Sequence, residues 1–291
     1  MNFPEFDKSV IVGIKKTIDN TFRDFARTWG ELLQDTLSPL HWALIHLEKF
    51  LLAVPWYIFL AVTGLIIWQV SKSWKLVLSS IASLIVIGLL GMWDDTIRTI
   101  SIIFVATTIC IVIGIPMGIL MAKKDKAQTI VTPVLDLMQT IPSFVYLIPV
   151  VMLFGLGKVP GLISIVIFAI PPVIRFTNLG LREVNDDLVE TAHALGLNPR
   201  HILTFIELPL ARPTIFGGIN QTIMMSLSMV IIASMIGVRG LGSQVMNAVG
   251  NNYLGLGVIS GLSIVALAII FDRIIQAYSK RKDWKYISKH L

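Results

Sequence analysis

The residues of this sequence that could do chemistry are the few ionisable side chains inside long apolar stretches. They are Asp136, Arg175, Asp272 and Arg273. A charge within a membrane span is costly, so it usually marks an ion or proton pathway or pairs with a second charge. A proton- or sodium-driven carrier would typically place a carboxylate near the middle of a span, whereas these residues lie near the ends of theirs. We therefore expect Asp136 to pair with a neighbouring arginine or to cap a broken helix.

Motifs for hydrolysis or metal binding are missing from the sequence. A nucleotide-binding loop needs Gly-Lys followed by Ser or Thr, but Gly157 and Lys158 are followed by Val159. Cys110 is the one cysteine, and His193 is a lone histidine that is expected to be a contact residue rather than a metal ligand. We predict that the chain is not an enzyme and carries no metal or cofactor of its own.

The composition indicates an integral membrane protein. The 291 residues have a mean hydropathy of +0.77 and only 14% are charged, whereas soluble domains are about a quarter charged. The net charge of +6 does not indicate nucleic-acid binding, because the basic residues lie at the ends of apolar segments. We predict an all-α, polytopic helical bundle with about seven spans. Their approximate ranges are 51–70, 76–92, 99–121, 132–154, 160–177, 213–237 and 255–276.

Three regions are expected along the chain: an amphipathic segment at 1–48, a membrane domain at 49–277 and a tail at 278–291. In the first region, Val10, Ile14 and Ile18 recur at helical spacing between charged residues. That stripe is typical of a helix on the membrane surface or of a helix packed on the rest of the protein. Both readings remain open.

The distribution of Lys and Arg predicts the orientation of the chain. If the loop at 183–209 is cytoplasmic, fifteen basic residues lie on that side, and the opposite loops hold only Arg98, Lys158 and Arg239. Because cytoplasmic loops are enriched in Lys and Arg, we expect the tail inside and the N-terminal segment outside.

Prolines interrupt several of the predicted spans, among them Pro116, Pro142, Pro149 and Pro171. Such breaks are tolerated where freed backbone groups face protein or a water-filled path. They are consistent with segments that line a pathway, and equally with close packing.

The loop at 183–209 is the longest polar interruption, and its residues predict two short helices. Asn185 can cap the first helix, and Gly196 can end it with a positive φ. Asn198 and Pro199 then begin a second helix, which Pro209 is expected to stop.

This loop resembles the Glu-Ala-Ala loop of permeases in ATP-binding-cassette (ABC) importers, in which Glu-Ala-Ala is followed by Gly and then by Ile-x-Leu-Pro. The spacing is intact, and the one departure is Thr191 in place of alanine. The resemblance implies the type I importer permease fold and a loop that couples to an ATPase. The implied coupling residues are Glu190, Thr191, Ala192, His193, Gly196, Ile206, Leu208 and Pro209.

Four further stretches, at 139–149, 171–180, 218–225 and 234–242, resemble the glycine betaine, proline and choline branch of these permeases. The resemblance implies a cell-membrane importer of a compatible solute, serving osmoprotection. Its expected partners are a second copy of the chain, two ATPases that bind ATP and magnesium, an extracytoplasmic binding protein and the lipid bilayer. The pathway candidates are Phe144, Tyr146, Asn220 and Met224.

The choice of solute stays open, because none of the seven tryptophans lies in the third to seventh segments. Tryptophan is the side chain that best holds a quaternary ammonium group, so selectivity is expected in the separate binding protein. The alternatives are an ion-coupled secondary transporter and an osmolyte channel.

Overall fold

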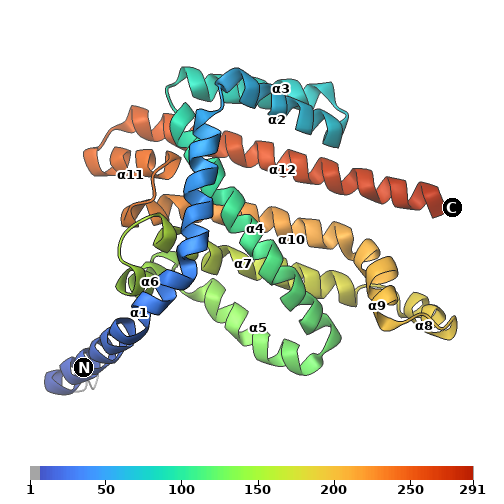
Figure 1. Ribbon diagram of the computed structural model, residues 1–291, viewed down its shortest axis with the longest axis horizontal. Coiled ribbons are helices and arrows are strands. Elements are labelled where there is room, and N and C mark those ends of the chain that lie inside the picture. The colour runs from blue at the N-terminus through green and yellow to red at the C-terminus, as the bar shows by residue number, and fades with distance from the viewer. Residues whose placement is uncertain (1–6, 291) are drawn as a thin grey trace, which may run out of the picture.

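The computed structural model describes the backbone of residues 7–290 and the side chains of residues 7–279. Within these residues the chain is helical, with short 3-10 segments at η1 and η3 and one π-helical segment at η2, and it contains no strand (Figure 1). The elements are α1 (Lys8–Ala53), α2 (Trp56–Ser71), α3 (Trp74–Leu89), α4 (Trp93–Lys123), α5 (Asp125–Thr140), η1 (Ser143–Tyr146), α6 (Leu147–Phe154), α7 (Lys158–Arg182), α8 (Asp186–Ala194), α9 (Pro199–Ile202), η2 (Leu203–Glu207), α10 (Leu208–Ala233), η3 (Ser234–Ile236), α11 (Leu241–Asn251) and α12 (Leu254–His290).

Four helices in the described part of the chain are long and apolar enough to cross a membrane: Trp93–Lys123, Lys158–Arg182, Pro199–Ile236 and Leu254–Ser279. Two bent pairs raise the count to six if each is one span, with a 106° bend between α1 and α2 and a 107° bend after α5. The predicted count of about seven is therefore too high. Helix α3 has 16 residues, fewer than the roughly 20 that a span needs.

The predicted segment at 132–154 is broken at Pro142, one of the prolines expected to interrupt a span, and it bends there by 107°. Helix α5 ends at Thr140, and Pro142 precedes the 3-10 turn η1, after which α6 runs in a new direction. The break follows because Pro142 has no N–H to continue the hydrogen bonding of α5, and its ring restricts Ile141 to an extended conformation. The mean hydropathy of a segment does not detect such a break, because it ignores backbone geometry.

The core is built on α7, which packs against both α4 and α10. Glycines allow the close approach: a Cβ on Gly118 of α4 would lie 2.5 Å from Thr177 Cβ, and one on Gly218 of α10 would lie 2.6 Å from Phe176 Cβ. At Gly118 and Gly218 the absence of a side chain therefore allows close helix packing. Pro116 and Pro171 lie inside continuous helices.

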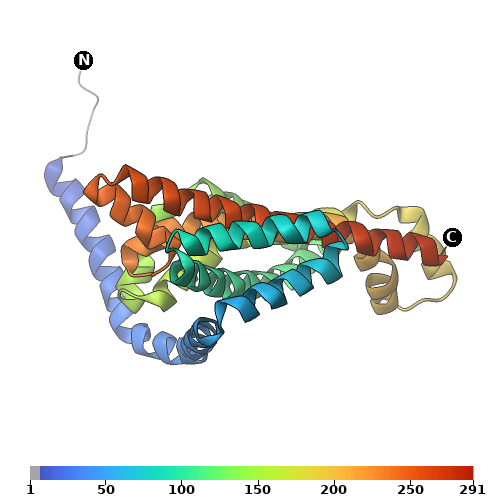
Figure 2. The same cartoon turned by 90° about the horizontal axis from the view of Figure 1, so that it is seen from above.

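Helix α1 is a single helix of 46 residues that passes through the predicted boundary at residue 48 and ends at Ala53. Figure 2 shows it crossing one end of the elongated bundle. Its last third packs on the protein, with Leu44 and Glu48 buried, whereas Val10 and Ile18 near its start are exposed. The predicted amphipathic stripe therefore remains without a partner in the described residues, and the docked part lies further along.

Candidate functional site

The loop between α7 and α10 forms the candidate site. It contains α8, α9 and η2, and it lies at the end of the bundle opposite to α6 and α11 (Figures 1 and 2). Helix α12 runs towards the same end. Because α7 leads into the loop and α10 leaves it, a movement of the loop is applied directly to the two helices of the core.

The first half of the loop folds as its residues predict. The Asn185 side chain accepts a hydrogen bond from the Asp187 N–H at 2.9 Å and so caps α8. Gly196 has a φ of 78°. The Gly196 N–H donates to the His193 carbonyl at 2.9 Å, and the Leu197 N–H donates to the Ala192 carbonyl at 3.1 Å. This pair of bonds is a Schellman motif, which favours glycine at the residue with positive φ.

The second half of the loop begins as predicted and ends differently. The Asn198 side chain accepts from the Arg200 N–H at 3.1 Å, and Pro199 occupies the first turn of α9. Pro209, however, does not stop the helix, since Pro199–Ile236 is continuous. The π turn at Leu203–Glu207, in which the Leu208 N–H bonds to the Leu203 carbonyl, directly precedes the proline. The wider turn lets the helix continue past a residue that has no N–H and a bulky ring.

The predicted coupling residues divide by burial. Ala192 is buried; Ile206, Leu208 and Pro209 are half-buried; and Glu190, Thr191, His193 and Gly196 are exposed. Sequence reasoning missed the exposed apolar side chains of the same loop, namely Leu188, Leu195, Leu197 and Phe205. Leu195 is 77% exposed and Phe205 67%. Exposed apolar side chains grouped on a polar loop are typical of a protein–protein contact.

Two ion pairs attach the loop to the bundle. Glu207, whose side chain is only 7% exposed, accepts a hydrogen bond from Lys123 Nζ at 2.7 Å. Arg182 at the end of α7 donates to Asp125 Oδ1 at 2.6 Å and to the Met121 carbonyl at 3.0 Å. The first pair connects the loop to the end of α4, and the contacts of Arg182 connect the residue just before the loop to the end of α4 and the start of α5. The sequence gave no signal for the pairing, because Lys123 and Glu207 are 84 positions apart.

The family model of the binding-protein-dependent transport system inner membrane component matches residues 114–284, which is more than half of the chain. The chain belongs to this family. It is 45% identical over 249 residues to the glycine betaine/proline betaine permease ProW of Escherichia coli, covering 86% of this chain and 70% of ProW. It is 47% identical over 273 residues to the glycine betaine/carnitine permease GbuB of Listeria monocytogenes, covering 92% of this chain and 94% of GbuB.

Solved structures show that this permease has the type I ABC importer fold. The inward-facing MetNI methionine transporter matches with a TM-score of 0.55 at 21% identity, covering 65% of this permease and 93% of that chain. An amino acid ABC transporter matches with a TM-score of 0.51 at 20% identity, covering 66% of this permease and 97% of that chain. The predicted family and fold class are thus confirmed.

Of the four ionisable residues singled out in the apolar segments, three have partners among the described residues, and the fourth, Arg273, is exposed. Asp136 on α5 forms an ion pair with Arg175 on α7, as predicted. Asp272 on α12 accepts hydrogen bonds from Asn220 at 2.7 Å and from Gln276 at 2.8 Å. Neither carboxylate is an isolated charge, so each has a structural role in the bundle.

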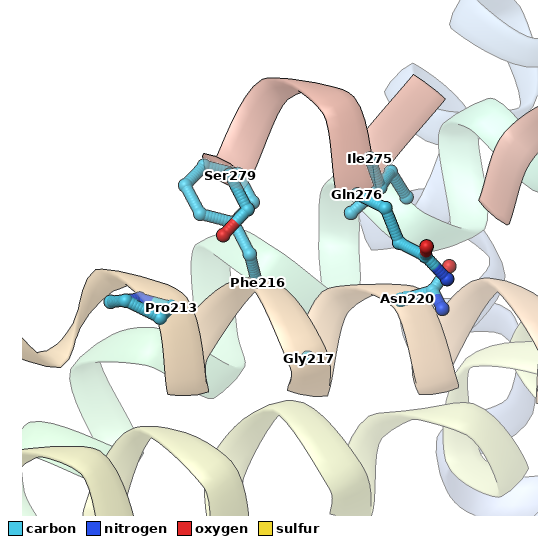
Figure 3. A pocket seen from close by; sticks show the side chains of 7 residues that line it. All are labelled: Pro213, Phe216, Gly217, Asn220, Ile275, Gln276 and Ser279. Atoms are coloured by element: carbon cyan, nitrogen blue, oxygen red, sulfur yellow. The ribbon is translucent and has the colours of Figure 1, made fainter. Parts of the chain in front are cut away.

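The pathway candidates are spread over two regions of the permease. Phe144 is exposed on η1, Tyr146 packs near Phe168, with ring centroids 6.5 Å apart, and Met224 contacts the hydrophobic core. Asn220 lines a cavity of about 290 Å³ between α10 and α12. Figure 3 shows Asn220 and Gln276 facing each other across this cavity, with Phe216 and Pro213 further along α10. Of the four candidates, Asn220 is the one that this cavity includes.

Proposed function

We propose that this permease forms the membrane pathway of an ABC importer for glycine betaine, choline or a related compatible solute. ProW and GbuB, both named for glycine betaine, are 45% and 47% identical to it over the aligned residues. A choline permease of Bacillus subtilis, OpuBB, is 30% identical over 188 residues. The greater identity to the glycine betaine permeases supports a betaine as the principal solute.

The single observation that carries the proposal is the loop at the end of α7 and α10. Its glycine-ended helix, its exposed leucines and its ion pair to α4 make it a projection with a defined shape and an apolar tip. We propose that this tip docks into a separate ATPase, which binds ATP and magnesium. Ala192 and the half-buried Ile206 would fix the shape of the projection, and the exposed Glu190 and His193 would contact the ATPase.

The orientation proposed for the chain has the loop and the tail at 278–291 in the cytoplasm, with the segment at 1–48 outside. The excess of Lys and Arg on the loop side supports it. A cysteine placed at Gly250, on exposed α11, should react with an impermeant thiol reagent from outside. A cysteine placed at Leu195 should react with this reagent only after the membrane is permeabilised. The buried Cys110 should not interfere. The opposite labelling pattern would overturn the orientation.

The functional unit would contain two copies of this chain, two ATPases and an extracytoplasmic binding protein that delivers the solute. Each copy supplies one loop, so a pair of ATPases is matched by a pair of permeases. Intact-mass measurement of the purified complex should give two copies of this chain. One copy beside a different second permease would contradict the homodimer.

Uptake into sealed vesicles tests the central proposal. Vesicles that contain the permease, its ATPase and the binding protein should accumulate radiolabelled glycine betaine only when ATP is present on the loop side. The runner-up, an ion-coupled carrier, is disfavoured because both Asp136 and Asp272 already have partners. Accumulation driven by a sodium or proton gradient without the ATPase would overturn the proposal.

A further inference from the structure

A second cavity lies far from the loop, beneath the sharp turn between α1 and α2. Its volume is about 580 Å³, within the range of small-molecule sites. Four elements meet there: the end of α1, α2, α3 and the start of α4. The lining residues are Leu52, Ala53, Val54, Pro55, Trp56, Leu60, Leu84, Ile85, Gly88, Leu89, Trp93 and Asp94.

Two indole rings and one carboxylate distinguish this cavity from a plain apolar groove. Trp56 is 61% exposed. Trp93 is held in place by an edge-to-face contact with Phe59, with ring centroids 5.6 Å apart and an angle of 87° between the ring planes. Gly88 lies against the Trp93 ring, since a Cβ there would be 3.4 Å from Trp93 Cε3, an ordinary van der Waals contact.

Asp94, an exposed residue in the first turn of α4, supplies a negative charge at the edge of the cavity. In the described part of the chain its carboxylate forms no hydrogen bond or ion pair. The adjacent Asp95 differs, since it accepts a hydrogen bond from Gln244 at 2.6 Å. Asp94 therefore lines the cavity as a carboxylate free to pair with a cation.

We propose that this cavity binds a small organic cation that carries alkyl groups on its nitrogen, of the choline type. Indole faces attract such cations, and the apolar walls accommodate the alkyl groups. The lining includes no Lys or Arg, so a second, anionic group on the ligand would lack a partner. The site should therefore select a simple cation over a zwitterion such as glycine betaine, and over a phospholipid headgroup, whose phosphate adjoins its ammonium.

This site is separate from the proposed pathway and does not depend on transport. None of its lining residues belongs to α7, α10 or the loop. Binding can be measured on the full-length permease without the ATPase, so its failure would leave the proposed importer untouched.

The test uses the permease in lipid discs of phosphatidylglycerol, a lipid without an ammonium group, and measures the binding of radiolabelled choline. We expect saturable binding that tetramethylammonium displaces. Trp56→Leu and Asp94→Asn should each weaken it about tenfold. Trp42→Leu is the matched control, because Trp42 is 63% exposed and lies on α1 outside the cavity. It should bind choline as the native protein does.

Three comparisons of ligand binding distinguish a free organic cation from an uncharged molecule, a zwitterion and a lipid headgroup. The uncharged isostere of choline, in which carbon replaces nitrogen, should bind at least tenfold more weakly, and so should glycine betaine. Equal binding of either would overturn the proposal, as would a complete lack of saturable binding or an equal loss in Trp42→Leu. If phosphatidylcholine added to the discs competes with choline in the native protein and not in Asp94→Asn, the occupant is a lipid headgroup. That result would overturn the assignment to a free cation.

Discussion

The two ends of the bundle are connected by charged side chains in different ways. Where α7 begins, Glu48 of α1 lies 2.7 Å from Lys158 of α7 and 3.9 Å from Arg98 of α4. The Glu48 side chain is only 12% exposed. Where α7 ends, each carboxylate has one cation, and each pair has one exposed member: Asp125 is 89% exposed in its pair with Arg182, and Lys123 is 44% exposed in its pair with the buried Glu207.

The difference indicates which end is fixed and which can move. A buried carboxylate shared by two cations cannot be removed without leaving those cations unpaired, which is costly. At the loop end each carboxylate has a single cation, so one exposed member of each pair, Asp125 or Lys123, can exchange its partner for water. We infer that the α1 end acts as the fixed end of α4 and α7, and that the loop end can shift when an ATPase docks there.

The largest effect is expected from Glu48→Ala. It leaves Lys158 and Arg98 partly buried without their carboxylate, and it should lower the free energy of unfolding by about 3 kcal/mol. The change is measured by following unfolding as the concentration of a denaturing detergent is raised. Glu31→Ala, at an exposed position of the same helix, is the control and should change stability by less than about 0.5 kcal/mol. Equal effects of the two variants would remove the proposed difference between the ends.

A smaller effect is expected from Glu207→Ala. Its carboxylate is buried, but its partner Lys123 is 44% exposed and can turn to water, so the loss should be about 1–2 kcal/mol. A double-mutant cycle with Lys123→Ala isolates the pair. Glu183→Ala, an exposed residue at the start of the loop, serves as the control. A loss as large as that of Glu48→Ala would show that the loop end is fixed too.

The loop was largely predictable because its structure is local. Asn185, Gly196 and Asn198 act on backbone groups two or three residues away, so their roles follow from residue type and spacing alone. Pro209 was misread, since the same residue type stops a helix or sits inside one, depending on the preceding turn. The π turn lies at Leu203–Glu207, two residues before Pro209 at the nearest, and the residue types there do not predict it.

The α1 end was not predictable, because its contacts are made by residues distant in the sequence. Glu48 and Lys158 are 110 positions apart, and no pattern around either residue indicates the other. Asp136 was an intermediate case. A carboxylate within an apolar segment was expected to have a partner, which predicted an arginine, but the position of Arg175 opposite it came only from the packing of α5 on α7.

Gly196→Val tests the shape of the loop rather than its attachment. The φ of 78° at Gly196 costs a residue with a Cβ roughly 1–2 kcal/mol, and no atom lies within 4 Å of the added Cβ. The variant should therefore reach the membrane at near-native levels but lose most ATP-driven uptake, because α8 and α9 are reoriented at the ATPase. Gly196→Asn should keep most of the activity, since asparagine tolerates positive φ. Native uptake by Gly196→Val would show that the loop is not the coupling element.

The smallest effect is expected from Glu190→Ala. Glu190 is exposed on α8, and its removal breaks no contact that holds the fold, so the stability of the isolated permease should be unchanged. If Glu190 forms an exposed ion pair with the ATPase, that pair is worth up to about 1 kcal/mol, which corresponds to a weakening of ATPase binding of about fivefold. Raising the salt concentration should reduce the difference between native and variant, because exposed pairs are screened. The affinity of the ATPase for the permease in lipid discs, measured at low and high salt, gives both quantities. Abolished binding would mean that this carboxylate, and not the apolar tip at Leu195 and Phe205, holds the ATPase. The loop end would then depend on one charge as strongly as the α1 end depends on Glu48.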